Sequence, residues 1–395
     1  MALIGLIAER TPGSALQLAK LLSFTIIPVF IIGPLAGVYV DRWDRRTTLF
    51  ICDFLRGLLV LSIPFIFLQR DSMIPIYIVV FLAFCLSRFY VPAKMSIVPD
   101  LVNSDHLLIA NSLLTTTGMI AFVLGCAVGG FLVDHIGARG GFICDAATFF
   151  ISGILVFSIR LPIRFNNIPS RILKTGKEVI AIIRKSAVEE MKEGLRYLIG
   201  HKEIRFVMSM LFVLLSAAGA IYVVIIIFIQ QSFQSVTRDL GVLAVFLGIG
   251  LLLGVLFQGR WGHKIPWHRT IFMCLISGGA MLILFVTNVY HFPRLSVAMI
   301  LVMLLGVMAG PVFIAANTLT HQVCEEQMRG KVFSALEMVV HFAFLVAMFI
   351  SSYLAEYFER AWILTGVGTI LILVGIFGLI MFRSNLALSG EKGHN

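Results

Sequence analysis

Apolar runs long enough to cross a membrane recur along the whole 395-residue chain, and they constrain its fold more than any other feature. The hydrocarbon core of a bilayer is about 30 Å thick, so a crossing helix needs about 20 mainly apolar residues. Residues 1–8 are also apolar and resemble the last two turns of a span whose beginning is missing. Eleven complete runs cover residues 16–40, 47–69, 74–94, 107–133, 140–159, 204–230, 239–260, 270–290, 294–318, 331–355 and 361–382.

The composition excludes a water-soluble protein. Hydrophobic residues make up 59% of the chain and charged residues 13%, whereas soluble domains carry about 25% charged residues. The six cysteines are scattered with no CxxC pair, so we interpret them as small buried side chains rather than as a metal or redox site. No Walker loop or other enzyme motif is present. The sequence therefore predicts an all-α membrane protein that is not an enzyme and needs no metal or cofactor.

The positive charges predict the orientation of the chain. In membrane proteins Lys and Arg collect in cytoplasmic loops. If residues 1–8 end outside, 22 of the 31 Lys and Arg residues lie in inner loops, seven lie in outer loops, and Arg56 and Arg88 lie within spans. We therefore expect a plasma (inner) membrane protein with the central loop and the C-terminus in the cytoplasm. The net charge of +10 then reflects topology and anionic membrane lipids rather than nucleic acid.

One long connection divides the chain into two halves. Within it, residues 187–199 place apolar side chains at helical spacing, which predicts an amphipathic helix on the inner membrane surface. Pro92 and Pro311, and Gly33 and Gly254, recur at offsets of about 220 residues, as an internal duplication would require. The predicted organisation is an N-terminal bundle, a cytoplasmic linker, a C-terminal bundle and a cytoplasmic tail, at 1–159, 160–203, 204–383 and 384–395.

A basic corner follows the first complete run. Its sequence is GPLAGVYVDRWDRR, in which Gly37 allows close helix approach and Asp41 can cap a helix end. The stretch closely resembles the signature G-x-x-x-D-R-x-G-R-R of the major facilitator superfamily, in the branch similar to enterobactin and macrolide exporters, with Asp44 in place of the glycine. The resemblance implies two six-helix bundles, here with the first helix truncated, and a monomer. It also implies a conformational latch at Gly33, Gly37, Asp41, Arg42, Arg45 and Arg46.

Three further stretches resemble family motifs. Gly125, Gly129 and Gly130 match the antiporter motif G-P-x-x-G-G, with a cysteine in the proline position, and plain helix packing explains them equally well. Residues 144–150 resemble the sixth-span pattern of the exporters. Pro-Ala-Lys at 92–94 resembles both the exporters and lysophospholipid transporters. A lipid flippase therefore remains an alternative to an exporter.

Ionisable residues within spans are expensive, and each needs a partner or a wet cavity. Asp53 and Arg56 are three residues apart on one helix face, and Arg88 lies at a similar depth. We therefore expect Asp53 to meet both arginines, in an ion cluster that is either structural or part of the gating mechanism. Asp145 lies about one turn below the outer surface, where we expect a structural polar contact, although it is also a candidate for proton coupling.

Glu337 and His341 form a second intramembrane pair. Their spacing of four puts them on one helix face, with His341 about 15 Å from the inner end of its run. Such a pair can pass protons or make interhelical hydrogen bonds.

The function predicted from these features is secondary transport by alternating access, with export of an amphipathic small molecule of the drug or siderophore type in exchange for protons. A non-transporting membrane protein that lacks its first helix is a further alternative.

Overall fold

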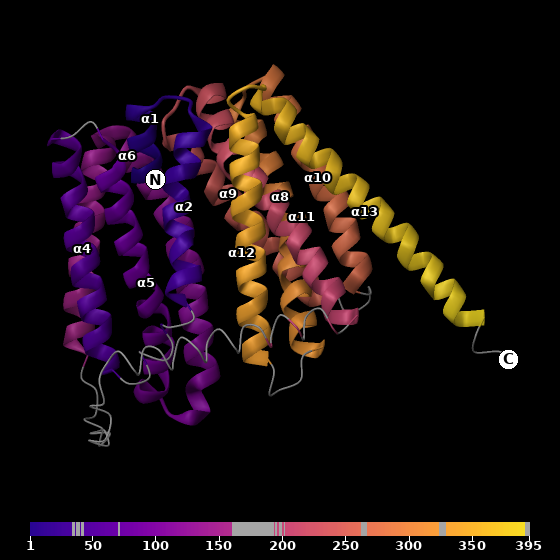
Figure 1. The fold of residues 1–395 in the computed structure, drawn as a ribbon, viewed down its shortest axis with the longest axis horizontal. Coiled ribbons are helices and arrows are strands. Elements are labelled where there is room, and N and C mark those ends of the chain that lie inside the picture. The colour runs from indigo at the N-terminus through magenta and orange to yellow at the C-terminus, as the bar shows by residue number, and fades with distance from the viewer. Residues whose placement is uncertain are drawn as a thin grey trace.

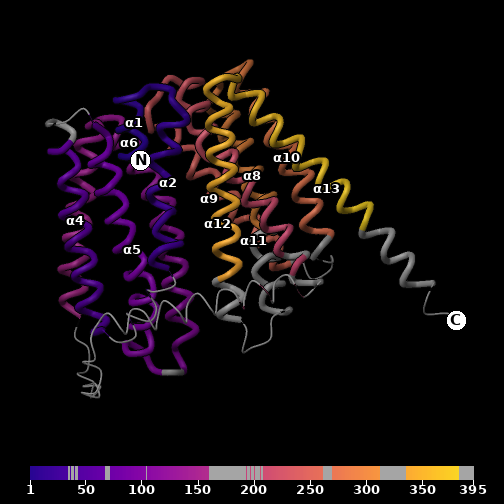
Figure 2. Tube along the Cα trace, viewed as in Figure 1, coloured from indigo at the N-terminus to yellow at the C-terminus, as the bar shows by residue number. Residues whose placement is uncertain are grey.

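The computed structural model describes residues 1–33, 36, 40, 43–69, 72–159, 193, 196, 200, 202–261, 267–323 and 329–391. Within these residues every regular element is a helix (Figures 1 and 2). Most of the linker 160–203, including most of the expected amphipathic helix, lies outside this part of the chain.

The two halves stand side by side, with α2 next to α12, and α13 slants away from the other helices toward the C-terminus (Figure 1). The N-terminal half contains α1 (Ala2–Arg10), α2 (Ala15–Ile31), α4 (Arg45–Gln69), α5 (Ile74–Leu101), η1 (Ser104–His106) and α6 (Leu107–Ser158). The C-terminal half contains α8 (Lys202–Phe233), α9 (Arg238–Trp261), α10 (Trp267–His291), α11 (Leu295–Val323), α12 (Arg329–Leu354) and α13 (Arg360–Glu391).

The expected all-α membrane fold is confirmed, because each of the eleven runs forms a helix. Eight helices in the described residues are long and apolar enough to cross a membrane. Two helices extend well past their runs: α5 continues to Leu101 and α13 continues to Glu391, beyond the expected span ends at 94 and 382.

Two of the expected spans share the helix α6 and meet at Gly137. This residue has φ +73°, a conformation that glycine adopts without strain, so the direction changes at one residue rather than over a loop. The Ala138 amide beyond it donates a hydrogen bond to Glu9 Oε1, at 3.1 Å. A carboxylate near α1's end therefore caps the second part of α6.

Glycines bring α9 and α11 into backbone contact. Gly250 and Gly254 on α9 face Gly306 and Gly310 on α11, so each helix presents a small residue at the same four-residue spacing. A methyl group added at Gly306 would lie 2.5 Å from the Leu247 carbonyl oxygen, so neither helix has room for a side chain there. Small residues at this spacing are a common way of packing helices in membranes, where dispersion contacts drive association.

Candidate functional site

One face of α12 changes from buried to exposed along its length. Glu337, Phe344, Met348 and Ser352 are seven, four and four residues apart, which puts them on one face. Met348 and Ser352 are 0% exposed, Phe344 is half-buried, and Glu337 is exposed. The Phe344 ring lies 5.6 Å from the ring of Tyr222 on α8, so this face turns toward other helices. This face is therefore buried toward the end of α12 and exposed at Glu337, toward its beginning.

The contact between α6 and α9 changes in the same direction. Thr237, just before α9, donates a hydrogen bond to the Gly130 carbonyl oxygen at 2.8 Å, and Gly130 packs against the backbone of Gly241. Farther from this contact, residues 115–122 of α6 are all exposed. We call the end where α2, α9 and α13 begin the closed end, and the end where α4, α10 and α12 begin the open end (Figure 1).

The glycine motif of α6 is therefore used unevenly. Gly130 makes the close contact with the other half, Gly129 lies near the Met1 side chain, and Gly125 has no neighbour within 4 Å of the position that a Cβ would take. The one close helix contact among the three is a backbone contact, which is what plain packing requires.

Polar contacts join the two halves at the closed end. Glu356 Oε1, in the turn between α12 and α13, accepts hydrogen bonds from the Ser14 hydroxyl at 2.9 Å and from the Leu16 amide at 3.1 Å. Arg360 donates to the Gly13 carbonyl oxygen at 2.9 Å. Sequence reasoning missed these residues, because charges in short outer loops were used only to assign topology.

Glu337 and His341 lie toward the open end, but their side chains do not bond to each other. His341 Nδ1 is 2.7 Å from the backbone oxygen of Glu337. A carbonyl oxygen can only accept, so this contact is a hydrogen bond when Nδ1 carries a proton. The Glu337 carboxylate makes no hydrogen bond or ion pair with any described residue.

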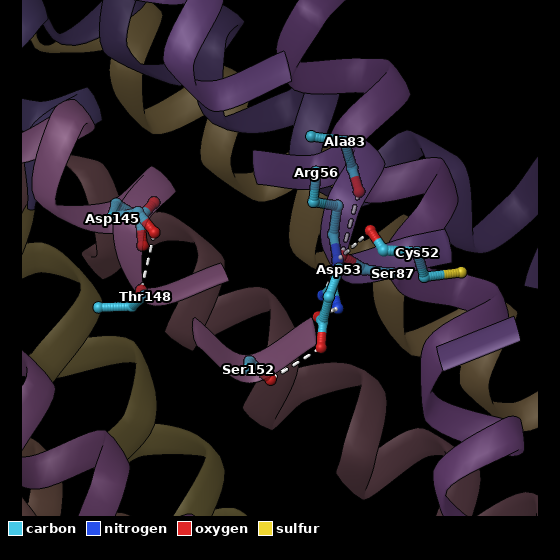
Figure 3. A network of polar contacts seen from close by, with 8 residues as sticks. All are labelled: Cys52, Asp53, Arg56, Ala83, Ser87, Asp145, Thr148 and Ser152. Atoms are coloured by element: carbon cyan, nitrogen blue, oxygen red, sulfur yellow. Dashed lines mark hydrogen bonds and ion pairs between the residues drawn. The ribbon is translucent and has the colours of Figure 1, made fainter. Parts of the chain in front are cut away.

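A second polar cluster lies inside the N-terminal half, between α4, α5 and α6 (Figure 3). Asp53, which is 1% exposed, forms an ion pair with Arg56 and accepts a hydrogen bond from the Ser152 hydroxyl at 2.7 Å. The Arg56 guanidinium lies 4.3 Å from the ring centre of Tyr90 and 4.8 Å from that of Phe149. A paired charge and aromatic faces both stabilise a buried guanidinium, so this cluster holds α4, α5 and α6 together.

The expectation that Asp53 meets two arginines is wrong. In the described part of the chain Arg56 is its one arginine partner, and the buried Arg88 Nε makes no hydrogen bond. Ser87 and Tyr90 contact Arg56 from one face of α5. Arg88 lies seven residues after Phe81, which packs against α2, so it belongs to a different face of α5.

Asp145 is exposed, and its backbone oxygen accepts a hydrogen bond from the Thr148 hydroxyl at 2.7 Å (Figure 3). One turn nearer the closed end, Gly141 packs against Ala2 of α1. Among the described residues no group of His, Cys, Asp and Glu side chains is arranged to hold a metal ion.

The described residues of the basic corner tie the N-terminal half together. Arg45 forms an ion pair with Asp100 at the end of α5. Arg46 donates to the Phe157 carbonyl oxygen at the end of α6, and its guanidinium carbon lies 4.7 Å from the centre of the Phe157 ring. Asp44 Oδ1 accepts a hydrogen bond from the Thr47 amide at 2.7 Å, so the residue that replaces the motif's glycine caps α4.

The rest of the expected latch is only partly visible. Gly33 has no neighbour within 4 Å of a Cβ position, and Gly37, Asp41 and Arg42 lie outside the described residues.

Comparison with known proteins identifies the family. The model of the Major Facilitator Superfamily matches residues 1–288 and, in a second match, residues 206–394. The chain belongs to the Major Facilitator Superfamily. This superfamily consists of transporters rather than enzymes, and the chain is accordingly an integral membrane protein with multiple spans.

Bacterial exporters are among the relatives of this facilitator, at low identity. The MFS-type transporter YfiS of Bacillus subtilis is 24% identical over 392 residues, covering 96% of this chain and 88% of YfiS. BacE of the same organism, named as a bacilysin exporter, is 24% identical and covers 77% of this chain and 71% of its own. Macrolide efflux protein A of Streptococcus pyogenes is 26% identical, covering 67% and 62%.

Solved structures show the same fold. The nucleoside transporter NupG superposes with a TM-score of 0.69 at 12% identity, covering 96% of this chain and 93% of NupG. A bacterial homologue of the iron transporter ferroportin, in an inward-facing state, superposes with a TM-score of 0.68 at 14% identity, covering 94% and 92%. At such identities the likeness extends to the major facilitator fold alone.

Proposed function

We propose that this facilitator exports amphipathic small molecules by alternating access and uses protons as the coupling ion. The observation that carries the proposal is the α12 face, on which Met348 and Ser352 are fully buried and Glu337 is exposed. Contacts between the halves at one end, with exposed residues toward the other, are what one state of an alternating-access cycle requires.

The expected orientation and the names of two relatives support export as the direction of transport. With the linker 160–203 and the C-terminal tail in the cytoplasm of a plasma membrane protein, the open end faces inward and receives cargo from the cell. Export also agrees with the names of two relatives, one a bacilysin exporter and the other a macrolide efflux protein. The two bundles 1–159 and 204–383 would then move relative to each other.

Proton coupling is assigned to Glu337, with His341 as its neighbour. A carboxylate without a described partner, on a face that opens between helices, can be protonated without breaking an existing ion pair. His341 lies one turn away on the same helix face, with Nδ1 against the backbone oxygen of Glu337, so an imidazole that can carry a proton stands beside the proposed coupling residue.

Transport assays with three probes test the proposal. Cells with and without the full chain are loaded with a macrolide, an amphipathic cationic dye and a short-chain fluorescent lysophospholipid. We expect lower accumulation of the macrolide or the dye in expressing cells, with the difference abolished by a protonophore. Equal accumulation of all three probes would count against export, and movement of the lysophospholipid alone would favour a flippase.

Glu337→Gln then tests the coupling residue. We expect this variant to lose uphill export while still exchanging labelled for unlabelled cargo, because it cannot release a proton. Glu359→Gln, outside the spans, is the control and should transport normally. Export by Glu337→Gln at the wild-type rate across external pH would show that this assignment is wrong.

A further inference from the structure

Two oppositely charged side chains, Glu356 in the turn between α12 and α13 and Arg360 at the start of α13, form hydrogen bonds with the start of α2 and the turn before it. Glu356 accepts hydrogen bonds from the Ser14 hydroxyl and the Leu16 amide, and Arg360 donates to the Gly13 carbonyl oxygen. Glu356 thus accepts from two donors of the N-terminal half, and Arg360 donates to one of its acceptors. These five residues, which we call the clasp, come from sequence positions more than 300 residues apart.

The N-terminal side of the clasp is built to bind a carboxylate. Ser14 is the N-cap of α2, and its side-chain oxygen already accepts from the Gln17 amide at 3.3 Å. The Leu16 amide is one of the first-turn donors that no residue within the helix can satisfy, and Glu356 from the other half satisfies it. The positive end of the helix dipole adds to this attraction.

The contact with Arg360 depends on a specific turn before α2. Gly13 has φ +77°, a left-handed conformation that suits glycine, and its carbonyl oxygen receives the Arg360 guanidinium. A Cβ at Gly13 would also lie 3.3 Å from Gln231 Nε2 of α8. The turn at 11–14 is therefore held between two elements of the C-terminal half.

The clasp lies next to buried residues of α2 and α12, two helices from opposite halves that contact each other. Ala15, in the first turn of α2, and Ser352, one turn before Glu356, are both 0% exposed. Separation of the clasp should therefore let water reach these positions. We propose that Glu356 and Arg360 hold the closed end shut and that their bonds to α2 break whenever that end opens. This inference rests on the proposed alternating access.

Cysteine labelling in the full chain measures the opening directly. The six native cysteines are replaced by alanine, and Ser352→Cys serves as the reporter, because the Ser352 hydroxyl is buried and makes no hydrogen bond that the change would remove. Thr270→Cys in α10 is the control reporter, since its hydroxyl is equally unpaired and lies inside one half. The probe is a water-soluble maleimide added to protein in detergent.

Glu356→Gln and Arg360→Gln should each accelerate labelling at Ser352→Cys by roughly threefold to tenfold. Gln at 356 keeps an acceptor but removes the charge that strengthens its two hydrogen bonds, and Gln at 360 removes the guanidinium. Glu359→Gln is the matched variant. This neighbouring acid accepts from the Tyr290 hydroxyl at 3.3 Å within the same half, so its loss should leave the labelling rate unchanged.

Three results would overturn the clasp. They are an unchanged rate at Ser352→Cys in Glu356→Gln, an equal acceleration by Glu359→Gln, and a parallel acceleration at Thr270→Cys, which would indicate general loosening. The assay uses neither cargo nor a proton gradient. Faster labelling without transport would thus support the clasp and contradict the proposed function, and unchanged labelling with normal transport would do the reverse.

Discussion

Removing Arg56 should destabilise the N-terminal half more than removing any other described charge. Arg56 forms the ion pair with Asp53, donates from Nε to the Cys52 carbonyl oxygen at 3.2 Å and lies over the rings of Tyr90 and Phe149. Arg56→Met keeps much of the apolar stem, so the change isolates the guanidinium from the packing of its side chain.

The magnitude follows from the burial of Asp53. With 1% exposure and only the Ser152 hydroxyl remaining, its carboxylate would be an unpaired charge inside the bundle. Removing one partner of such a pair costs about 3 to 5 kcal/mol. Neutralising both partners leaves no unpaired charge, so Asp53→Asn combined with Arg56→Met should recover most of that loss.

Thermal unfolding in detergent, followed by the fraction that stays monodisperse, ranks the variants. We expect a midpoint lower by on the order of 10 °C for Arg56→Met and an intermediate value for the double variant. Arg88→Met is the matched control, because the Arg88 Nε makes no hydrogen bond, and it should lower the midpoint less. If Arg56→Met is as stable as the parent, or the double variant is no more stable than the single one, the assignment of this cluster as a structural tie fails.

Two further predictions concern packing and capping. Gly250→Leu should prevent folding or lower the unfolding midpoint strongly, because a side chain there would overlap the Met303 carbonyl oxygen, whereas Gly366→Leu, with no neighbour within 4 Å, should be tolerated. Asp44→Ala should lower the free energy of unfolding by about 1 kcal/mol, because it removes the cap on the Thr47 amide. Asp44→Asn keeps an acceptor there and should retain most of that stability. Equal midpoints for the two leucine variants, or for Asp44→Ala and the parent, would contradict these readings.

The spans were predictable because hydropathy is a local property of the chain. Each apolar run became a helix, and the largest differences are at ends such as Leu101 and Glu391, where a helix continues beyond the apolar stretch. The pair of Asp53 and Arg56 was predictable for the same reason, since a spacing of three fixes their relation within one helix.

Relations between helices were not predictable in this way. The depth of Arg88 could be counted along the sequence, but its direction around α5 depends on which face packs against α4, and no spacing within one helix supplies that. The bond between Ser14 and Glu356 joins residues 342 positions apart, and no local pattern marks either of them as partners. The contacts of Arg45 and Arg46 with Asp100 and Phe157 likewise follow from how α4, α5 and α6 meet.

The glycine contacts of α9 have a mechanical consequence. Against α11 this helix is joined by glycines over two turns, with no side chain between the backbones that could slide or change rotamer. Against α6 it is joined by the contact of Gly241 with Gly130 and the bond from Thr237. If the two halves rotate relative to each other, α9 and α11 should move together as one rigid unit. The contact between α9 and α6 should then be either the point about which these two helices rotate or the contact that breaks when they move away from the N-terminal half.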